Sequence, residues 1–197
     1  MFKKAIFILA SVIIASQVPA QGQVILEHDF SLNLGMQWES LYVLPLFPTM
    51  GGELGLSYGL DVRYNDNWSV VPGAEASAYV VASSSGGMVI PFADIYCLSR
   101  HRKQRHGVDM AVAFGPELMF IPIDGTVDSD IESLPGWTIV APKQFTAYQL
   151  GLKQQTFFYI NDHIYMGMEL NVGVWSIASP YLWLYINTLR FCTGIRL

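Results

Sequence analysis

The clearest pattern in the sequence is a regular alternation of apolar and polar residues between positions 53 and 81. Over residues 53–64 every second side chain is apolar, and the positions between them are small or charged. Asn65-Asp66-Asn67 follows, and such residues readily adopt turn conformations. The alternation then resumes over residues 68–81. Because successive side chains of a strand point to opposite faces, the stretch predicts a β-hairpin with one apolar and one polar face.

The same alternation recurs along most of the remaining chain and predicts six further strands. They span residues 27–38, 88–98, 108–123, 145–160, 164–175 and 185–197. The weakest of them is 88–98, which is apolar on both faces and has only Asp94 to orient it. The phase blurs at Gln154-Gln155, which indicates a bulge there. We therefore predict eight strands. Residues 41–47 and 137–141 could each add one, which would give ten.

The connections between these strands are of two kinds. Those at residues 65–67, 100–106 and 161–163 are short and polar, whereas those at 39–51, 124–143 and 179–183 are long or contain proline. Outer-membrane barrels show this asymmetry, with short periplasmic turns and longer external loops. Aromatic residues flank both sets, as expected for the two interfacial girdles of such a barrel. They are Trp38, Trp175, Tyr181 and Trp183 beside the loops, and Tyr64, Trp68, Tyr159 and Tyr165 beside the turns.

Composition favours a membrane environment. Apolar residues make up 52% of the chain and charged residues 14%, against roughly 25% charged residues in ordinary soluble domains. The most apolar stretch beyond residue 20, residues 164–186, contains Glu169 and Asn171 near its middle. A central acid disfavours a spanning helix by about 2.5–3.5 kcal/mol. The other structure that satisfies every backbone group in lipid is a closed β-barrel. We therefore predict an all-β, closed, antiparallel up-and-down transmembrane β-barrel.

The barrel prediction assigns the two faces of each strand. Leu56, Leu60, Met168 and Leu170 should face lipid, and Glu53, Arg63, Glu75 and Glu169 should face the lumen. The wider set of charged residues on the lumen face comprises Glu27, Asp29, Glu53, Asp61, Glu75, Asp109, Glu117, Glu169, Arg63, Lys153, Arg190 and Arg196. An eight-stranded barrel is just wide enough for its own side chains. We therefore expect a packed network of salt bridges and water rather than an open channel.

The first twenty residues have the pattern of a secretory signal peptide. Lys3 and Lys4 precede an apolar segment at residues 5–15, and Val18-Pro19-Ala20 supplies small residues for cleavage. We predict a signal peptide over 1–20 and the barrel domain over 21–197. Without Lys3 and Lys4, 11 − 2 = 9 basic residues remain against 16 acidic residues, a net charge of −7. This balance argues against a nucleic-acid partner.

Taken together, these features resemble the small outer-membrane β-barrel proteins of the OmpA/OmpX-like superfamily, which are porin-like in architecture. The resemblance rests on the signal peptide, the glycine-rich alternating strands, the Trp after an Asn/Asp turn, and the closing Gly194-Ile195-Arg196-Leu197. It covers the whole of residues 21–197. The family usually ends on an aromatic residue, whereas this chain ends on Leu197. The resemblance implies a bacterial outer-membrane location, with outer-membrane lipid around the barrel.

Residues with catalytic or metal-binding chemistry form no convincing site. The topology places His28, His101, His106 and His163 at the turn end, so a Ser-His hydrolase at the outer rim has no histidine to use. Asp124, Asp128 and Asp130 leave an aspartate-based rim protease as an alternative. The basic segment 100–106 is interpreted as a solvated turn against headgroups rather than a phosphate site, and its histidines lack companions for a metal. We therefore predict no catalytic, cofactor-binding or metal-binding residues and no cofactor.

The two cysteines, Cys97 and Cys192, are far apart in sequence. Both lie near predicted strand ends on opposite walls, and a disulfide needs Cα atoms within about 7 Å. We therefore expect no disulfide between them.

The sequence thus predicts a non-enzymatic, monomeric outer-membrane barrel with a structural or surface-interaction role. Its partner contacts would lie on loops 39–51 and 124–143, with Trp137 as the candidate contact residue, because a rigid barrel holds such loops at its rim. One alternative is a soluble, exported lipocalin-like barrel that binds a small apolar ligand, with the two faces exchanged. A second alternative is an outer-membrane barrel hydrolase.

Overall fold

The computed structural model describes residues 24–41, 51–83, 86–105, 108–121, 137–139, 147–177 and 184–197. Its strands are β1 (Ile25–Leu41), β2 (Gly51–Arg63), β3 (Trp68–Ser83), β4 (Gly86–Arg105), β5 (Val108–Ile121), β6 (Trp137–Ile139), β7 (Ala147–Tyr159), β8 (Ile164–Ile177) and β9 (Leu184–Arg196). Within these ranges no helix is long and apolar enough to cross a membrane.

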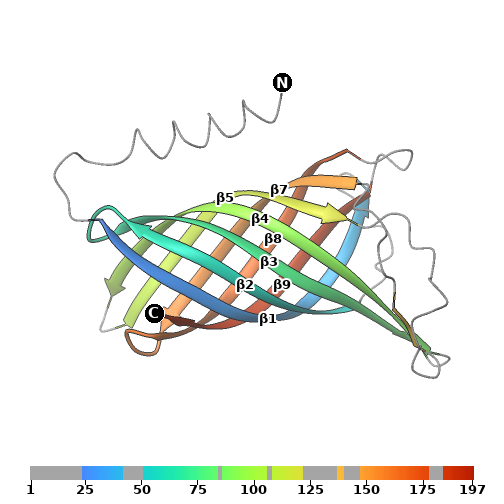
Figure 1. Cartoon of the computed structure of the whole chain (residues 1–197), viewed down its shortest axis with the longest axis horizontal. Helices are drawn as coiled ribbons and strands as arrows, with labels where there is room; N and C mark the ends of the chain where they lie inside the picture. Colours follow the sequence, from blue (N-terminus) through green and yellow to red (C-terminus); the bar gives the residue numbers. More distant parts are fainter. Residues whose placement is uncertain are drawn as a thin grey trace.

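Eight of the strands form a closed antiparallel barrel (Figure 1). Neighbours in the chain pair with one another, and β1 pairs with β9 to close the ring. The short β6 stands apart, because it pairs in parallel with β4 at Gly87–Val89 and is not part of the closed ring. The eight-stranded prediction is therefore confirmed. Of the two stretches that could have given ten strands, 137–141 supplies only β6, and residues 42–47 lie outside the described residues.

The barrel is apolar outside and polar inside. On β2, Leu56 is 65% exposed, whereas Glu53 is 4% exposed because it points into the lumen. The last strand repeats the arrangement, with Phe191 65% exposed and Arg190 fully buried. The alternation in the sequence therefore has the predicted orientation: the apolar residues form the outer wall, and the charged residues fill the interior.

Two of the tight turns have the same construction. The Asn65 side-chain oxygen accepts hydrogen bonds from the backbone N–H groups of Asn67 and Trp68, at 2.9 and 2.8 Å. Asn161 does the same for His163 and Ile164, both at 2.8 Å. In both turns an asparagine side chain thus accepts hydrogen bonds from backbone N–H groups and stabilises the reversal of chain direction. Both turns lie at the end of the barrel where β9 finishes (left in Figure 1).

The prediction of a basic turn at residues 100–106 is wrong. Strand β4 continues to Arg105 and stays paired with β5, with His101 opposite Val112 and Arg105 opposite Val108. The even-numbered residues of β4 therefore keep pointing inward past Leu98, so Arg100 lies in the lumen instead of in solvent. A run of charges resembles a solvated turn, but here it supplies counterions for inward-facing acids.

The predicted bulge at Gln154-Gln155 is also misplaced. The register between β7 and β8 shifts between Leu150 and Gly151 instead. An extra residue reverses the side-chain alternation beyond it. Trp175, one of the girdle aromatics expected beside the loops, consequently lies opposite Leu150 and is exposed on the outer wall.

The cysteines are both free, as expected. Their positions differ from the prediction, because both lie within strands rather than near strand ends. Cys97 pairs with Pro72 on β3, and Cys192 pairs with Asn33 on β1 and Gly167 on β8.

Candidate functional site: the charged lumen

The centre of the lumen is crossed by two buried cations. Arg190 of β9 donates from Nη1 to Glu75 at 2.6 Å and to Glu169 at 2.7 Å, and from Nη2 to Glu53 at 2.5 Å. Its bonds therefore connect β9 to β3, β8 and β2 across the interior. Because the side chain is fully buried, these are desolvated ion pairs, in which each charge depends on its partners.

Lys153 of β7 forms the second crossing. Its Nζ lies 2.8 Å from Glu75 and 3.0 Å from Glu169, and it lies 3.5 Å from Glu117 and 3.7 Å from Asp94. The ammonium group also lies 4.3 Å from the centre of the Tyr96 ring, close enough for a cation–π interaction. Gly73 makes room for that ring, because a side chain at this position would collide with Tyr96.

Amide side chains complete the central cluster. Asn33 donates to Glu75 at 3.0 Å, Asn171 to Glu117 at 2.9 Å and Gln155 to Glu169 at 2.7 Å. The network thereby joins side chains from seven of the eight barrel strands, and Asp94 adds the eighth, β4, through its contact with Lys153. The result is a cross-linked plug at mid-height rather than a channel lining.

This cluster contains more negative than positive charge. Its five carboxylates, Glu53, Glu75, Asp94, Glu117 and Glu169, surround two cations, Lys153 and Arg190, a formal balance of 2 − 5 = −3. Among the described atoms, neither oxygen of Asp94 has a hydrogen-bond partner. Buried carboxylates are costly without compensation. Both cations are therefore essential to the stability of the interior.

A second tier lies nearer the turn end. Arg100 of β4 contacts Asp29 of β1 and donates to Asp61 of β2 at 2.8 Å, and all three are buried. The guanidinium lies 5.2 Å from the centre of the Phe157 ring. Tyr165 packs edge-on against Phe157, with centroids 4.8 Å apart. This tier closes the lumen again below the central cluster.

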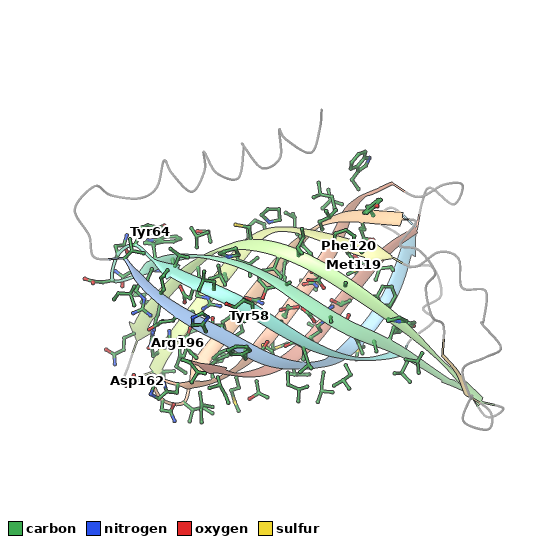
Figure 2. All side chains as sticks on the ribbon, viewed as in Figure 1. Tyr58, Tyr64, Met119, Phe120, Asp162 and Arg196 are labelled. Carbon is green, nitrogen blue, oxygen red and sulfur yellow. The ribbon has the colours of Figure 1, made fainter. Side chains whose placement is uncertain are left out.

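The mouth at the turn end is polar and hollowed. Glu27 joins Arg63 at 2.7 Å and Arg196 at 3.3 Å, and the Tyr159 ring lies between Arg102 and Arg196, at 4.3 and 4.5 Å. Around them is a pocket of about 370 Å³ lined by Glu27, Arg63, Asp66, Arg102, Asp162, His163, Arg196 and Leu197. Figure 2 labels Arg196 and Asp162 at this end. Side chains of both charge signs therefore line this pocket.

The opposite end of the lumen is closed by apolar side chains. Tyr79, Phe92, Met119 and Ile186 are buried together there. The Gln149 side chain forms two hydrogen bonds with the backbone of Ile186. It donates to the carbonyl at 2.7 Å and accepts from the N–H at 2.7 Å. Figure 2 shows Met119 far from Asp162, at the other end of the barrel.

The sequence placed most of this network correctly. All twelve charged residues predicted on the lumen face lie on inward-facing strand positions, and each of them takes part in an ion pair. Nine of these twelve belong to the central cluster or to the Glu27 pairs at the mouth, and Asp29, Asp61 and Asp109 pair with Arg100 or Arg102. Arg100 and Arg102 were missed. The signal that could have found them is the even-numbered phase set by Asp94, which continues through Tyr96 and Leu98.

Three of the four histidines are described, and they lie at the turn end as predicted. His28 forms a hydrogen bond with the Tyr58 hydroxyl, His101 packs at a tilt against Trp68 with ring centroids 4.5 Å apart, and His163 lies in the turn after Asn161. His106 and the loop residues Asp124, Asp128 and Asp130 lie outside the described residues. In the part of the chain that the structure describes, no group of three or more His, Cys, Asp or Glu side chains could hold a metal ion.

Solved structures with a similar fold are small outer-membrane barrels. Ail, the attachment invasion locus protein of Yersinia pestis, matches 87% of this chain over 98% of its own length, with a TM-score of 0.50 and 11% identity. Neisserial surface protein A has a TM-score of 0.49 with 10% identity, covering 85% of this chain and 96% of that one. OprG from Pseudomonas aeruginosa has a TM-score of 0.44 with 11% identity, covering 91% and 99%.

Sequence comparison gives no such match, since neither a protein-family model nor a curated protein sequence is similar to this chain. At 11% identity the likeness to Ail concerns the fold alone. The closed ring of eight antiparallel strands leads to the same conclusion independently. This chain therefore has the fold of the small, eight-stranded outer-membrane β-barrels.

Proposed function

We propose that the protein is a monomeric, non-enzymatic barrel of the bacterial outer membrane, exported through a cleaved signal peptide, that acts through its external loops. The observation that carries the proposal is the inside-out barrel with a cross-linked interior. An outer wall of residues such as Leu56 and Phe191 suits lipid contact. An interior joined by Arg190 and Lys153 suits a structural plug better than a pore.

The same interior disfavours the two alternatives. A lipocalin-like carrier needs an apolar cavity, whereas an apolar ligand here would meet desolvated carboxylates such as Glu75 and Glu169. An outer-rim hydrolase needs a base near the rim. The histidines that the structure describes, His28, His101 and His163, are all at the turn end.

The outer rim supports a role in surface contact because it is extended on one side. The β3–β4 pairing runs on to Ser83 and Gly86, beyond the last β2 partner at Val80 and the last β5 partner at Ala93. This hairpin projects past the barrel (lower right in Figure 1). Strand β6, residues 137–139 of the predicted loop 124–143, pairs onto this hairpin. Loops 39–51 and 124–143 are the proposed contact regions.

Bilayer conductance tests the closed interior. Purified protein should produce no large, stable conductance steps, because ion pairs and packed side chains cross the lumen at several levels. A general porin prepared in the same detergent serves as the positive control. Large, stable steps from this protein would contradict the plugged lumen and favour a transport role.

Loop deletion tests the contact role. Cells that display a variant lacking residues 126–140, which removes β6, should lose surface adhesion while the barrel still reaches the membrane. A matched control is Asn67→Gly, which alters a turn at the opposite end. Unchanged adhesion after the deletion would remove the case for this loop.

A further inference from the structure

The outer wall of the barrel carries an apolar groove of about 810 Å³ that crosses β1, β2, β3, β8 and β9. We call its floor the stretch of β3 that presents only the small side chains of Ala74 and Ala76, beside Tyr58 and Leu56 of β2. Larger apolar residues line the rest of the groove, and they include Phe30, Leu56 and Ile195. All three are well exposed, so the groove opens outward and not into the lumen.

A polar pair lies at one side of this groove. The hydroxyl of Tyr58, a groove residue, lies 2.9 Å from Nδ1 of His28, and both side chains are exposed on the outer wall. When the hydroxyl donates to Nδ1, His28 carries its proton on Nε2 and can donate it outward. The groove therefore combines a long apolar surface with an outward-facing hydrogen-bond donor.

The depth of the pair matches a lipid headgroup region. His28 is in register with Leu60, three residues from the end of β2 at Arg63, or about 10 Å along the strand. Figure 2 shows Tyr58 in the half of the barrel nearer the turns. In an outer-membrane barrel this half lies in the periplasmic leaflet, where polar and aromatic side chains meet phosphate and ester groups.

We propose that this groove is a binding site for a single phospholipid of the periplasmic leaflet. One acyl chain covers the floor at Ala74 and Ala76, and a phosphate or ester oxygen accepts a hydrogen bond from His28. The inference rests on the proposed membrane location of the barrel.

A flexible acyl chain fits this surface better than a second copy of the protein. A second copy related by two-fold symmetry would have to place a side chain of the same patch in the hollow over Ala74 and Ala76. A flexible chain of methylene groups can instead follow the floor along its length. Filling the hollow also recovers the dispersion contacts that a void forfeits.

Native mass spectrometry of the purified full-length barrel in detergent tests the proposal, with phosphatidylethanolamine as the probe. The wild-type protein should retain one lipid at low lipid concentration. Ala76→Trp fills the floor and should abolish this retention, whereas Val172→Trp, on the outward face of β8 outside the groove, should not. His28→Ala should weaken binding by about tenfold through loss of one hydrogen bond to a charged group, and His163→Ala is its control.

Equal lipid retention by Ala76→Trp and Val172→Trp would overturn the inference, because the lipid would then be ordinary annular lipid. A protein dimer that Ala76→Trp disrupts would overturn it in favour of a second copy. Heat-modifiable gel mobility, recorded for every variant, distinguishes failure of the lipid site from failure of the proposed membrane barrel. If the protein is a heat-modifiable, membrane-integral barrel but retains no lipid at this site, this inference alone is refuted. If the protein is water-soluble, the proposed function is refuted and this inference with it.

Discussion

Replacing Arg190 with methionine is expected to lower the free energy of unfolding by roughly 3–5 kcal/mol, the usual cost of removing one partner from a buried ion network. Methionine keeps most of the volume but leaves Glu53, Glu75 and Glu169 without their shared cation. The cluster already has three more acids than bases, so the loss cannot be offset locally. Urea unfolding of the refolded barrel in lipid vesicles measures the effect.

A matched control is available at the mouth of the same lumen. Arg63 pairs with Glu27, and both side chains keep about a fifth of their surface exposed. Arg63→Met should therefore cost only about 1 kcal/mol or less. Combining Glu53→Gln with Arg190→Met should restore part of the lost free energy of unfolding, because it removes one of the unpaired charges that Arg190→Met leaves. Equal costs for Arg190→Met and Arg63→Met would contradict the account of the central cluster.

The second large effect is expected on the outer wall. Phe191 lies near the middle of β9 and pairs with Leu34 on β1 and Met168 on β8. Phe191→Arg should destabilise the barrel by roughly 2–4 kcal/mol, the cost of an arginine at the bilayer midplane. Leu26→Arg, also on the outer wall but near the turn end, should cost about 0–1 kcal/mol, because the penalty falls towards the interface.

These two substitutions distinguish a membrane barrel from a soluble one. In a soluble barrel, an exposed phenylalanine could be replaced by arginine with little effect or with a gain in solubility. Folding yields in vesicles, read from the heat-modifiable band on gels, give the comparison. A Phe191→Arg variant that folds as well as Leu26→Arg would show that the outer wall does not face lipid.

Alternation, taken together with the apolar composition, was enough to predict the barrel and the orientation of its faces. Strands with one polar face, such as β1, β2 and β8, were identified because apolar residues facing lipid alternate with polar residues facing the lumen in a membrane barrel. This alternation is visible in the sequence as a period of two residues. The Asx turns at Asn65 and Asn161 were equally visible, since their side chains complete the reversal locally.

The incorrect predictions share one cause: in each case the structure depends on contacts between strands that are distant in sequence. Arg100 sits in a run of charges that resembles a turn, and its partners Asp29 and Asp61 lie on other strands. The bulge near Leu150 depends on pairing between β7 and β8, and no local signal in the sequence reveals it. The partners of Arg190 are likewise distant in sequence, so alternation predicts that it faces the lumen without specifying which acids it binds.

The groove could not be predicted for a related reason. Alanine at positions 74 and 76 is ordinary in a strand, and it lines a hollow only together with larger residues of other strands, such as Leu56, Phe30 and Ile195. The Tyr58–His28 pair also joins residues thirty positions apart.

The central claim is that this inside-out barrel is an integral protein of the outer membrane, and fractionation of expressing cells tests it most directly. Membranes are washed with alkaline carbonate, and the protein is run on gels with and without boiling. We expect the protein to stay in the outer-membrane pellet and to migrate faster before boiling than after it. Recovery in the carbonate-soluble fraction, with the same mobility in both lanes, would contradict the account.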